Sequence, residues 1–150
     1  MDINIIKNLR EETGAGVMDA KKALEDAAGD VEKAKELLRA KGVERASKKS
    51  DREINAGKVF AYIHSTGTVG ALIKLGCETD FVAKNDEFTK VGNEIAMQVA
   101  AMGTDELTIE DLLEQDYIRD TSKKIKDLIT EAVSKTGENI TLAEITRFAI

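Results

Sequence analysis

The stretch GKVFAYIHSTGTVGALIKLGC, residues 57–77, contains two runs that are rich in β-branched and aromatic residues. The first run covers residues 58–64, the second covers residues 69–77, and the short polar segment STGT lies between them. This arrangement is typical of a β-hairpin, in which two antiparallel strands are joined by a tight turn. The sequence therefore predicts an antiparallel sheet in this part of the chain.

The residues after the hairpin indicate two helices, a loop and a third strand. Apolar residues recur at helical spacing over residues 88–102 and again over residues 125–133. The acidic segment 104–120 is predicted to be a solvated loop, and residues 140–148 to be a third strand. This order predicts an α+β fold in which helices cover one face of the sheet. The predicted helix ends are Asn85 as the N-cap of the first helix, Thr121 or Ser122 at the start of the second, and Gly137 at its end.

Three short helices are predicted in residues 1–42, where apolar residues again recur at helical spacing. Glycines divide these helices, and Gly42 is predicted to end the third one. Residues 43–56 are rich in charge and poor in apolar anchors, so they are predicted to form a linker that is partly helical. The predicted organisation is a three-helix domain at 1–42, a charged linker at 43–56 and an α+β domain at 57–150.

Charge and composition exclude several classes of partner. The net charge of −6 argues against direct binding to nucleic acids, because a clustered basic surface supplies most of that affinity. No stretch approaches the roughly 20 apolar residues of a membrane-spanning helix, and residues 1–4 show neither a basic leader nor an apolar signal core. The single cysteine, Cys77, fits a reducing compartment. We therefore expect a cytoplasmic protein that binds neither nucleic acids nor membranes.

The residue set does not support catalytic or metal chemistry. Cys77 and His64 are the single thiol and the single imidazole of the chain. Hairpin pairing places His64 opposite Val69, roughly 26 Å from Cys77 at about 3.3 Å per residue, so the two cannot form a dyad. Zinc normally requires several cysteine or histidine ligands, and the phosphate-binding sequence GxxxxGKS/T is missing from the chain. We expect no enzymatic activity, no catalytic residue, no metal site and no cofactor, with Cys77 buried and His64 on the surface.

Three motifs resemble those of one protein family. They are TGAGVMDAKKAL at residues 13–24, CETDFVA at residues 77–83 and KTGENI at residues 135–140, and together they resemble elongation factor Ts over nearly the whole chain. The resemblance implies an N-terminal three-helix bundle similar to a ubiquitin-associated domain, a linker, and an α+β core on a three-stranded antiparallel sheet. Val17 departs from the methionine that many relatives carry there.

The resemblance also implies a function and partners. Members of this family are guanine-nucleotide exchange factors that bind the GTPase domain of elongation factor Tu. They disturb its magnesium and phosphate site and promote GDP release during translation elongation. This chain has room for one core repeat, which implies a homodimer, although the connection at 103–120 is shorter than is usual in the family.

The second motif contains the residues that the resemblance assigns to magnesium displacement, namely Thr79, Asp80, Phe81 and Val82. Phe81 is the implied insertion side chain and Asp80 is its polar companion. The residues alone favour another interpretation, in which Phe81 packs beneath the following helix, because most phenylalanines in small domains are buried.

The N-terminal domain supplies a second implied contact with the GTPase domain. The resemblance assigns it to Val17 and Met18, with Arg10 and Lys21 as nearby charged candidates. The alternative interpretation makes Met18 a core residue and Lys21 a solvated charge. A different function also stays open from the residues alone, namely an adaptor whose three-helix domain binds a peptide or a ubiquitin-like surface.

Overall fold

The predicted hairpin forms one side of a three-stranded antiparallel sheet with strand order β1-β2-β3. The computed structural model describes residues 2–104 and 106–150. The strands are β1 (Ala56–Ile63), β2 (Val69–Cys77) and β3 (Ile140–Ala149). Ala56 pairs with Cys77 and Ile63 pairs with Gly70, which confirms the predicted hairpin register. The His64 amide donates to the Val69 carbonyl at 2.9 Å, so His64 and Cys77 lie at opposite ends of the hairpin.

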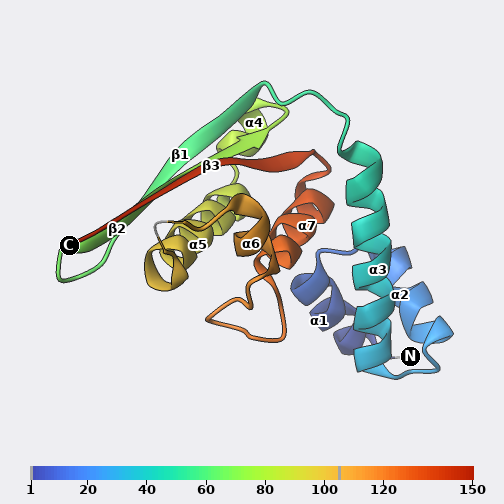
Figure 1. Cartoon of the computed structure of the whole chain (residues 1–150). Coiled ribbons are helices and arrows are strands. Elements are labelled where there is room, and N and C mark those ends of the chain that lie inside the picture. The colour runs from blue at the N-terminus through green and yellow to red at the C-terminus, as the bar shows by residue number, and fades with distance from the viewer. Residues whose placement is uncertain (1, 105) are drawn as a thin grey trace.

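Four helices follow the hairpin among the described residues and lie against one face of the sheet (Figure 1). They are α4 (Asp80–Ala83), α5 (Asp86–Met102), α6 (Ile109–Glu114) and α7 (Ile125–Thr136). Asn85 caps α5 by accepting from the Glu87 amide at 2.8 Å, and Gly137 ends α7 in a left-handed conformation. Both of these helix ends were predicted correctly. The α+β fold class is therefore confirmed.

One prediction about the acidic segment 104–120 and one about the start of the helix after it are wrong. The segment contains α6, because the Thr108 side chain caps the helix at the Asp111 amide and Leu112 is fully buried. Helix α7 starts at Ile125 with Lys124 as its N-cap, instead of at Thr121 or Ser122. The Lys124 amide donates to the Asp127 carboxylate at 2.8 Å, which satisfies a donor at the helix start. Asp105 of the predicted loop lies outside the described residues.

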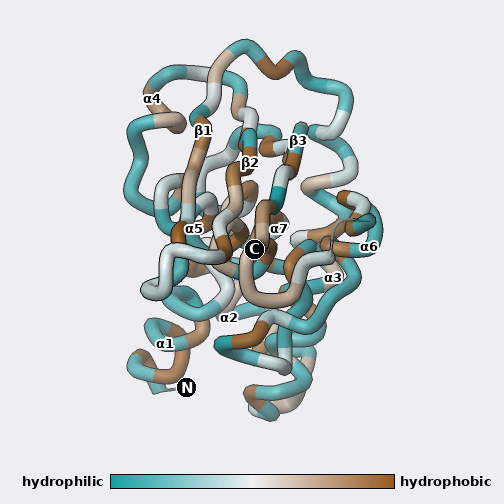
Figure 2. Tube along the Cα trace, turned by 60° about the vertical axis from the view of Figure 1, so that its left-hand side comes forward, coloured by the Kyte–Doolittle hydropathy of each residue, from teal (hydrophilic) through white to brown (hydrophobic). Residues whose placement is uncertain are grey.

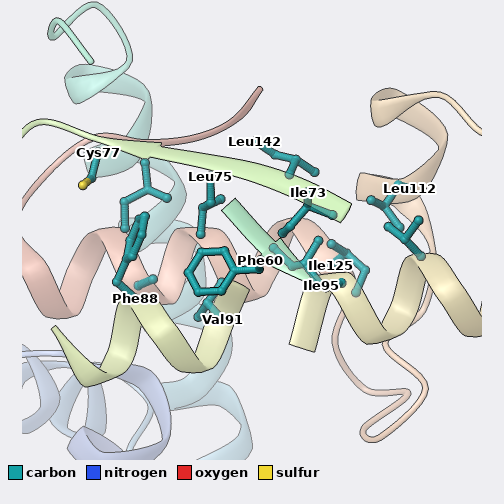
Figure 3. Close-up of a cluster of buried hydrophobic side chains, with 14 of the residues drawn as sticks. Phe60, Ile73, Leu75, Cys77, Phe88, Val91, Ile95, Leu112, Ile125 and Leu142 are labelled. Carbon is teal, nitrogen blue, oxygen red and sulfur yellow. The ribbon is translucent and has the colours of Figure 1, made fainter. Parts of the chain in front are cut away.

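The core of the α+β region lies between the sheet and α5 (Figure 3). Phe60 of β1 and Phe88 of α5 pack with their ring centroids 5.9 Å apart in a tilted arrangement. The Phe60 ring lies directly over Gly92, where a side chain would collide with it. Burial alternates in the middle of β2, where Ala71, Ile73 and Leu75 are buried while Leu72 and Lys74 are exposed, as expected for a sheet that is covered on one face.

The N-terminal module consists of α1 (Ile3–Thr13), α2 (Val17–Asp26) and α3 (Val31–Lys49). Its buried residues form a cluster separate from the core of the α+β region. Asp2 caps α1 and Asp30 caps α3 through their side chains. The cluster consists of Leu9, Ala20, Ala23, Leu24, Ala27, Ala34 and Leu38.

The prediction that Gly42 ends the third helix is wrong, because α3 continues to Lys49. Residues 43–49 of the predicted linker are therefore helical. A Cβ atom at Gly42 would lie 3.4 Å from Ser134 Oγ and 3.5 Å from Thr130 Cγ2, so the glycine marks a close approach of α3 to α7. The division of the chain into domains stays a prediction, and the structure adds that the two parts are in contact at this point.

Candidate partner-binding site

Phe81 is on the first turn after β2, in the four-residue helix α4. Its side chain is 89% exposed, which is unusual for a large apolar residue. The interpretation that Phe81 packs beneath the following helix is therefore wrong. Asp80 precedes it on the same turn and is also exposed. We call this exposed pair the tip, and Figure 1 places α4, which carries it, near one end of the sheet.

The rest of α4 points inward and holds this tip on the core. Val82 and Ala83 are only 8% and 4% exposed and belong to the main hydrophobic cluster. Thr79 is the N-cap, and its hydroxyl oxygen accepts a hydrogen bond from the Val82 amide at 3.4 Å. Of the four residues assigned to this segment, the structure thus exposes Thr79, Asp80 and Phe81 and buries Val82.

A carboxylate from the short connection between α7 and β3 also holds the tip. Glu138 accepts hydrogen bonds from the backbone amides of Glu78 and Thr79 and from the Thr79 hydroxyl. Sequence reasoning did not assign Glu138 a role. The motif KTGENI, which contains Glu138, is the signal in the sequence that points to this residue.

Cys77 lies directly beneath the tip but is not a reactive thiol. Its side chain is fully buried, and Sγ donates to the Thr79 carbonyl at 3.3 Å. Burial, reinforced by the nearby Glu138 carboxylate, raises the pKa of the Cys77 thiol above its ordinary value. The group is therefore a protonated thiol at neutral pH, which confirms the prediction of a small buried residue.

The N-terminal module presents a second apolar surface at the start of α2. Val17 is half-exposed and Met18 is 74% exposed, so the interpretation of Met18 as a core residue is wrong. Arg10 is exposed on α1, and Lys21 is exposed on α2, where it lies 3.8 Å from Glu25. Figures 1 and 2 place α2 and α4 in different parts of the molecule, so the structure keeps the two predicted contact surfaces apart.

Asp19, next to Met18, ties the start of α2 to α3. Its carboxylate accepts from Arg45 Nη1 at 2.8 Å and also from the Lys41 ammonium group. These two hydrogen bonds, first that from Arg45, lower the pKa of the Asp19 carboxyl below its ordinary value. The second surface is therefore supported by ion pairs between helices of the module.

The described residues also bear on two other classes of site. Within residues 2–104 and 106–150, no group of three or more potential ligands is placed to hold a metal ion. The same residues contain no helix that is long and apolar enough to cross a membrane.

Comparison with known proteins shows to which family the chain is related. A family model described as elongation factor TS matches residues 78–150. The chain is 41% identical to elongation factor Ts of Leptospira biflexa over 97% of this chain and 95% of the relative. It is 40% identical to elongation factor Ts of Thermotoga maritima over 100% of this chain and 96% of the relative.

These relatives are longer than the chain. The alignment with the Thermotoga maritima protein spans 191 positions against 150 residues here, so that relative has internal segments that this chain lacks. The alignment nevertheless covers almost all of both proteins, and the three motifs lie within the aligned region. The chain therefore belongs to the elongation factor Ts family of translation elongation factors.

Proposed function

We propose that the chain is a guanine-nucleotide exchange factor that binds the GTPase domain of elongation factor Tu and promotes GDP release. The observation that carries the proposal is the 89% exposure of Phe81 on a turn whose next two residues, Val82 and Ala83, are buried. An apolar ring held in water gains about 1.5–3 kcal/mol when a partner buries it. The tip is thus suited to enter a cleft in another protein.

Exchange of this kind requires no acid, base or nucleophile in the factor. A GTPase holds its nucleotide through a phosphate loop and a magnesium ion, and displacement of either one weakens nucleotide binding. Phe81 would enter beside that site, and Asp80 would lie next to it as the polar companion. Binding couplings are reciprocal: if the factor lowers the affinity of the GTPase for nucleotide, bound nucleotide must lower the affinity for the factor by the same ratio. The proposal therefore describes a binding protein without catalytic residues, metal or cofactor, acting in the cytoplasm.

A direct test is the Phe81→Ala variant in an assay of labelled GDP release from elongation factor Tu. Because Phe81 is exposed, the variant should fold with stability within about 0.5 kcal/mol of the original protein. Loss of the buried ring should slow release about tenfold or more, since 1.4 kcal/mol corresponds to a factor of ten. Leu37→Ala, which removes another exposed apolar side chain, is the matched control and should release GDP normally.

Two results would count against this proposal. A well-folded Phe81→Ala variant with unchanged GDP release would remove the tip from the mechanism. If the original protein leaves GDP release unchanged, the exchange function itself fails. Recovery of the chain outside the cytoplasm after cell fractionation would contradict the proposed location.

The proposal includes a homodimer, in which a second copy of the chain covers the outer face of the sheet. On this face Ile63 and Phe148 flank Gly70 in one row of the register, and Leu72 lies in the next row. Ile63 and Phe148 are 66% and 73% exposed. The charged pair on the same face, Lys74 and Glu144, is already joined at 2.6 Å, so no unpaired charge opposes an apolar contact between identical faces.

Mass in solution tests the dimer. Light scattering at micromolar concentration should give twice the mass of one chain, and Leu72→Lys should reduce it to a single chain by placing a charge in the contact. A single-chain mass for the original protein would overturn the dimer and leave the exchange proposal intact.

A further inference from the structure

The turn that carries Phe81 is held by hydrogen bonds from a segment about 60 residues away in sequence. Glu138 Oε1 accepts from the Glu78 amide at 3.1 Å and from the Thr79 amide at 3.0 Å. Glu138 Oε2 accepts from the Thr79 hydroxyl at 2.7 Å. One carboxylate thus binds three donors in the two residues that join β2 to α4, and it ends their freedom to rotate independently.

The same contact is made in the opposite direction. Glu78 Oε1 accepts from the Asn139 amide at 2.7 Å and lies 3.6 Å from Arg52 Nη1. The Asn139 side chain donates to the carbonyl of Arg52 at 2.9 Å. Glu138 therefore binds the backbone amide of Glu78, and Glu78 binds the backbone amide of Asn139, the residue after Glu138. We call this arrangement the glutamate clamp, formed by Glu78 and Glu138.

The clamp satisfies groups that the secondary structure leaves unpaired. Strand β2 ends at Cys77, so the amides of Glu78 and Thr79 have no partner in the sheet. Helix α4 has four residues, too few to be stable alone, because the first helical turn is the costly one. The orientation of α4 therefore depends on the residues that precede it.

Thr79 transmits the contact to the helix. Its hydroxyl donates to Glu138 and accepts from the Val82 amide, so the carboxylate, the hydroxyl and the first turn of α4 form one chain of hydrogen bonds. Hydrogen bonds to a charged acceptor are stronger than neutral ones. Phe81 lies between Thr79 and Val82, and its direction is set when both of these neighbours are held.

We infer that Glu138, with Glu78 as its counterpart, is a positioning residue for Phe81 in the exchange reaction. The inference rests on the proposed function. A side chain that must enter a partner at a defined angle gains affinity and rate when it is held in advance, because less ordering remains to be done on binding. Without the clamp Phe81 would still be present and exposed and Val82 would still pack on the core, but the residues that join β2 to α4 would be less restrained.

The experiment compares Glu138→Ala, Glu138→Gln and the control Glu114→Ala. Glu114 also accepts from two donors, the ammonium groups of Lys124 and Lys126, but it touches neither the tip nor its backbone. The first readout is amide hydrogen exchange. In Glu138→Ala the amides of Glu78, Thr79 and Val82 should exchange at least about tenfold faster, while those in the middle of β2 keep their protection.

The second readout is GDP release from elongation factor Tu. Glu138→Ala should lower the maximal release rate at least about fivefold, a loss of the size expected for hydrogen bonds to a charged group. Glu138→Gln should restore much of it, because the amide oxygen can accept from the two backbone amides and the amide nitrogen can donate to the Thr79 hydroxyl. Glu114→Ala should match the original protein in both readouts.

The two readouts separate the clamp from the exchange function. Unchanged amide exchange at the tip in Glu138→Ala overturns the clamp, whatever happens to GDP release. Slow release by Phe81→Ala together with normal release by Glu138→Ala leaves the proposed function standing and overturns the positioning role. Should Glu138→Ala fail to fold, Thr79→Val removes only the hydroxyl link. This variant should accelerate amide hydrogen exchange at Val82 and slow GDP release, as expected for Glu138→Ala.

Discussion

The tip around Phe81 and the α2 surface around Met18 both expose an apolar side chain near the start of a helix, but they are supported differently. The tip is held by hydrogen bonds to backbone groups and by Val82, which is packed into the larger core. The α2 surface is held by ion pairs of Asp19 and by a small, alanine-rich cluster. Backbone hydrogen bonds fix direction, whereas partly exposed ion pairs contribute little stability. The comparison indicates that the tip is held rigidly, whereas the α2 surface belongs to a module that unfolds more easily.

Size explains the difference. Domains below about 40 residues rarely bury enough apolar surface to be stable alone. The N-terminal module is near that limit, and it contacts α7 where Gly14 lies against Lys135 and Gly42 lies against Thr130. Docking on α7 thus supplies part of the support that its own core lacks.

Matched truncations in the two cores should give the largest difference between the regions. Leu24 in the N-terminal module and Leu75 in β2 are 2% and 0% exposed, and each change to Ala should cost about 2–5 kcal/mol. Leu75→Ala should destabilise the sheet, α5 and the tip together. Leu24→Ala should open the N-terminal module first and leave the core protected. Amide hydrogen exchange followed during thermal unfolding distinguishes these outcomes.

One result would contradict the expectation that the two regions unfold separately. If Leu24→Ala exposes amides of the core and of the module at the same temperature, the docking on α7 joins them into one cooperative unit. The N-terminal module would then not unfold separately from the core.

A smaller effect is expected from truncation of the second surface. Met18 is exposed, so Met18→Ala should fold normally, but it should lose about 1–2 kcal/mol of binding to elongation factor Tu. The concentration for half-maximal GDP release should then rise about 5–30-fold, while the maximal rate stays unchanged. Phe81→Ala, by contrast, should lower the maximal rate. Titration of both variants in one GDP release assay makes the comparison.

The assignment of separate roles depends on that contrast. A reduced maximal rate for Met18→Ala with an unchanged half-maximal concentration would make the α2 surface part of the displacement itself. Glu25→Ala is the control, because Glu25 pairs with Lys21 on the same helix but is not assigned to the contact.

Local sequence signals predicted much of the fold. The hairpin followed from β-branched runs on either side of a glycine turn, and its register was confirmed residue by residue. Asn85 and Gly137 identified helix ends, because capping depends on one side chain or on one left-handed residue. The site residue Phe81 came from the motif CETDFVA, whereas the residues alone favoured burial.

The errors occurred where distant contacts override local preference. Gly42 is typical of a helix end, yet α3 continues through it, and α7 packs closely there because glycine has no side chain. The acidic run at 104–120 reads as solvated, yet Leu112 enters the core and draws α6 with it. Glu138 reads as one surface charge among many until the fold places it against Thr79.

Residue patterns along the chain were enough to predict the strands, most of the helices, the separation of Cys77 from His64 and the family to which the motifs point. These properties depend on side-chain periodicity, on capping residues and on residues close together in the chain. Three-dimensional packing was needed to see that Phe81 faces solvent while Val82 is buried, and that Glu138 binds Thr79 just before them. The physical reason is that burial and long-range hydrogen bonds depend on which distant segments meet, and no local pattern specifies that meeting.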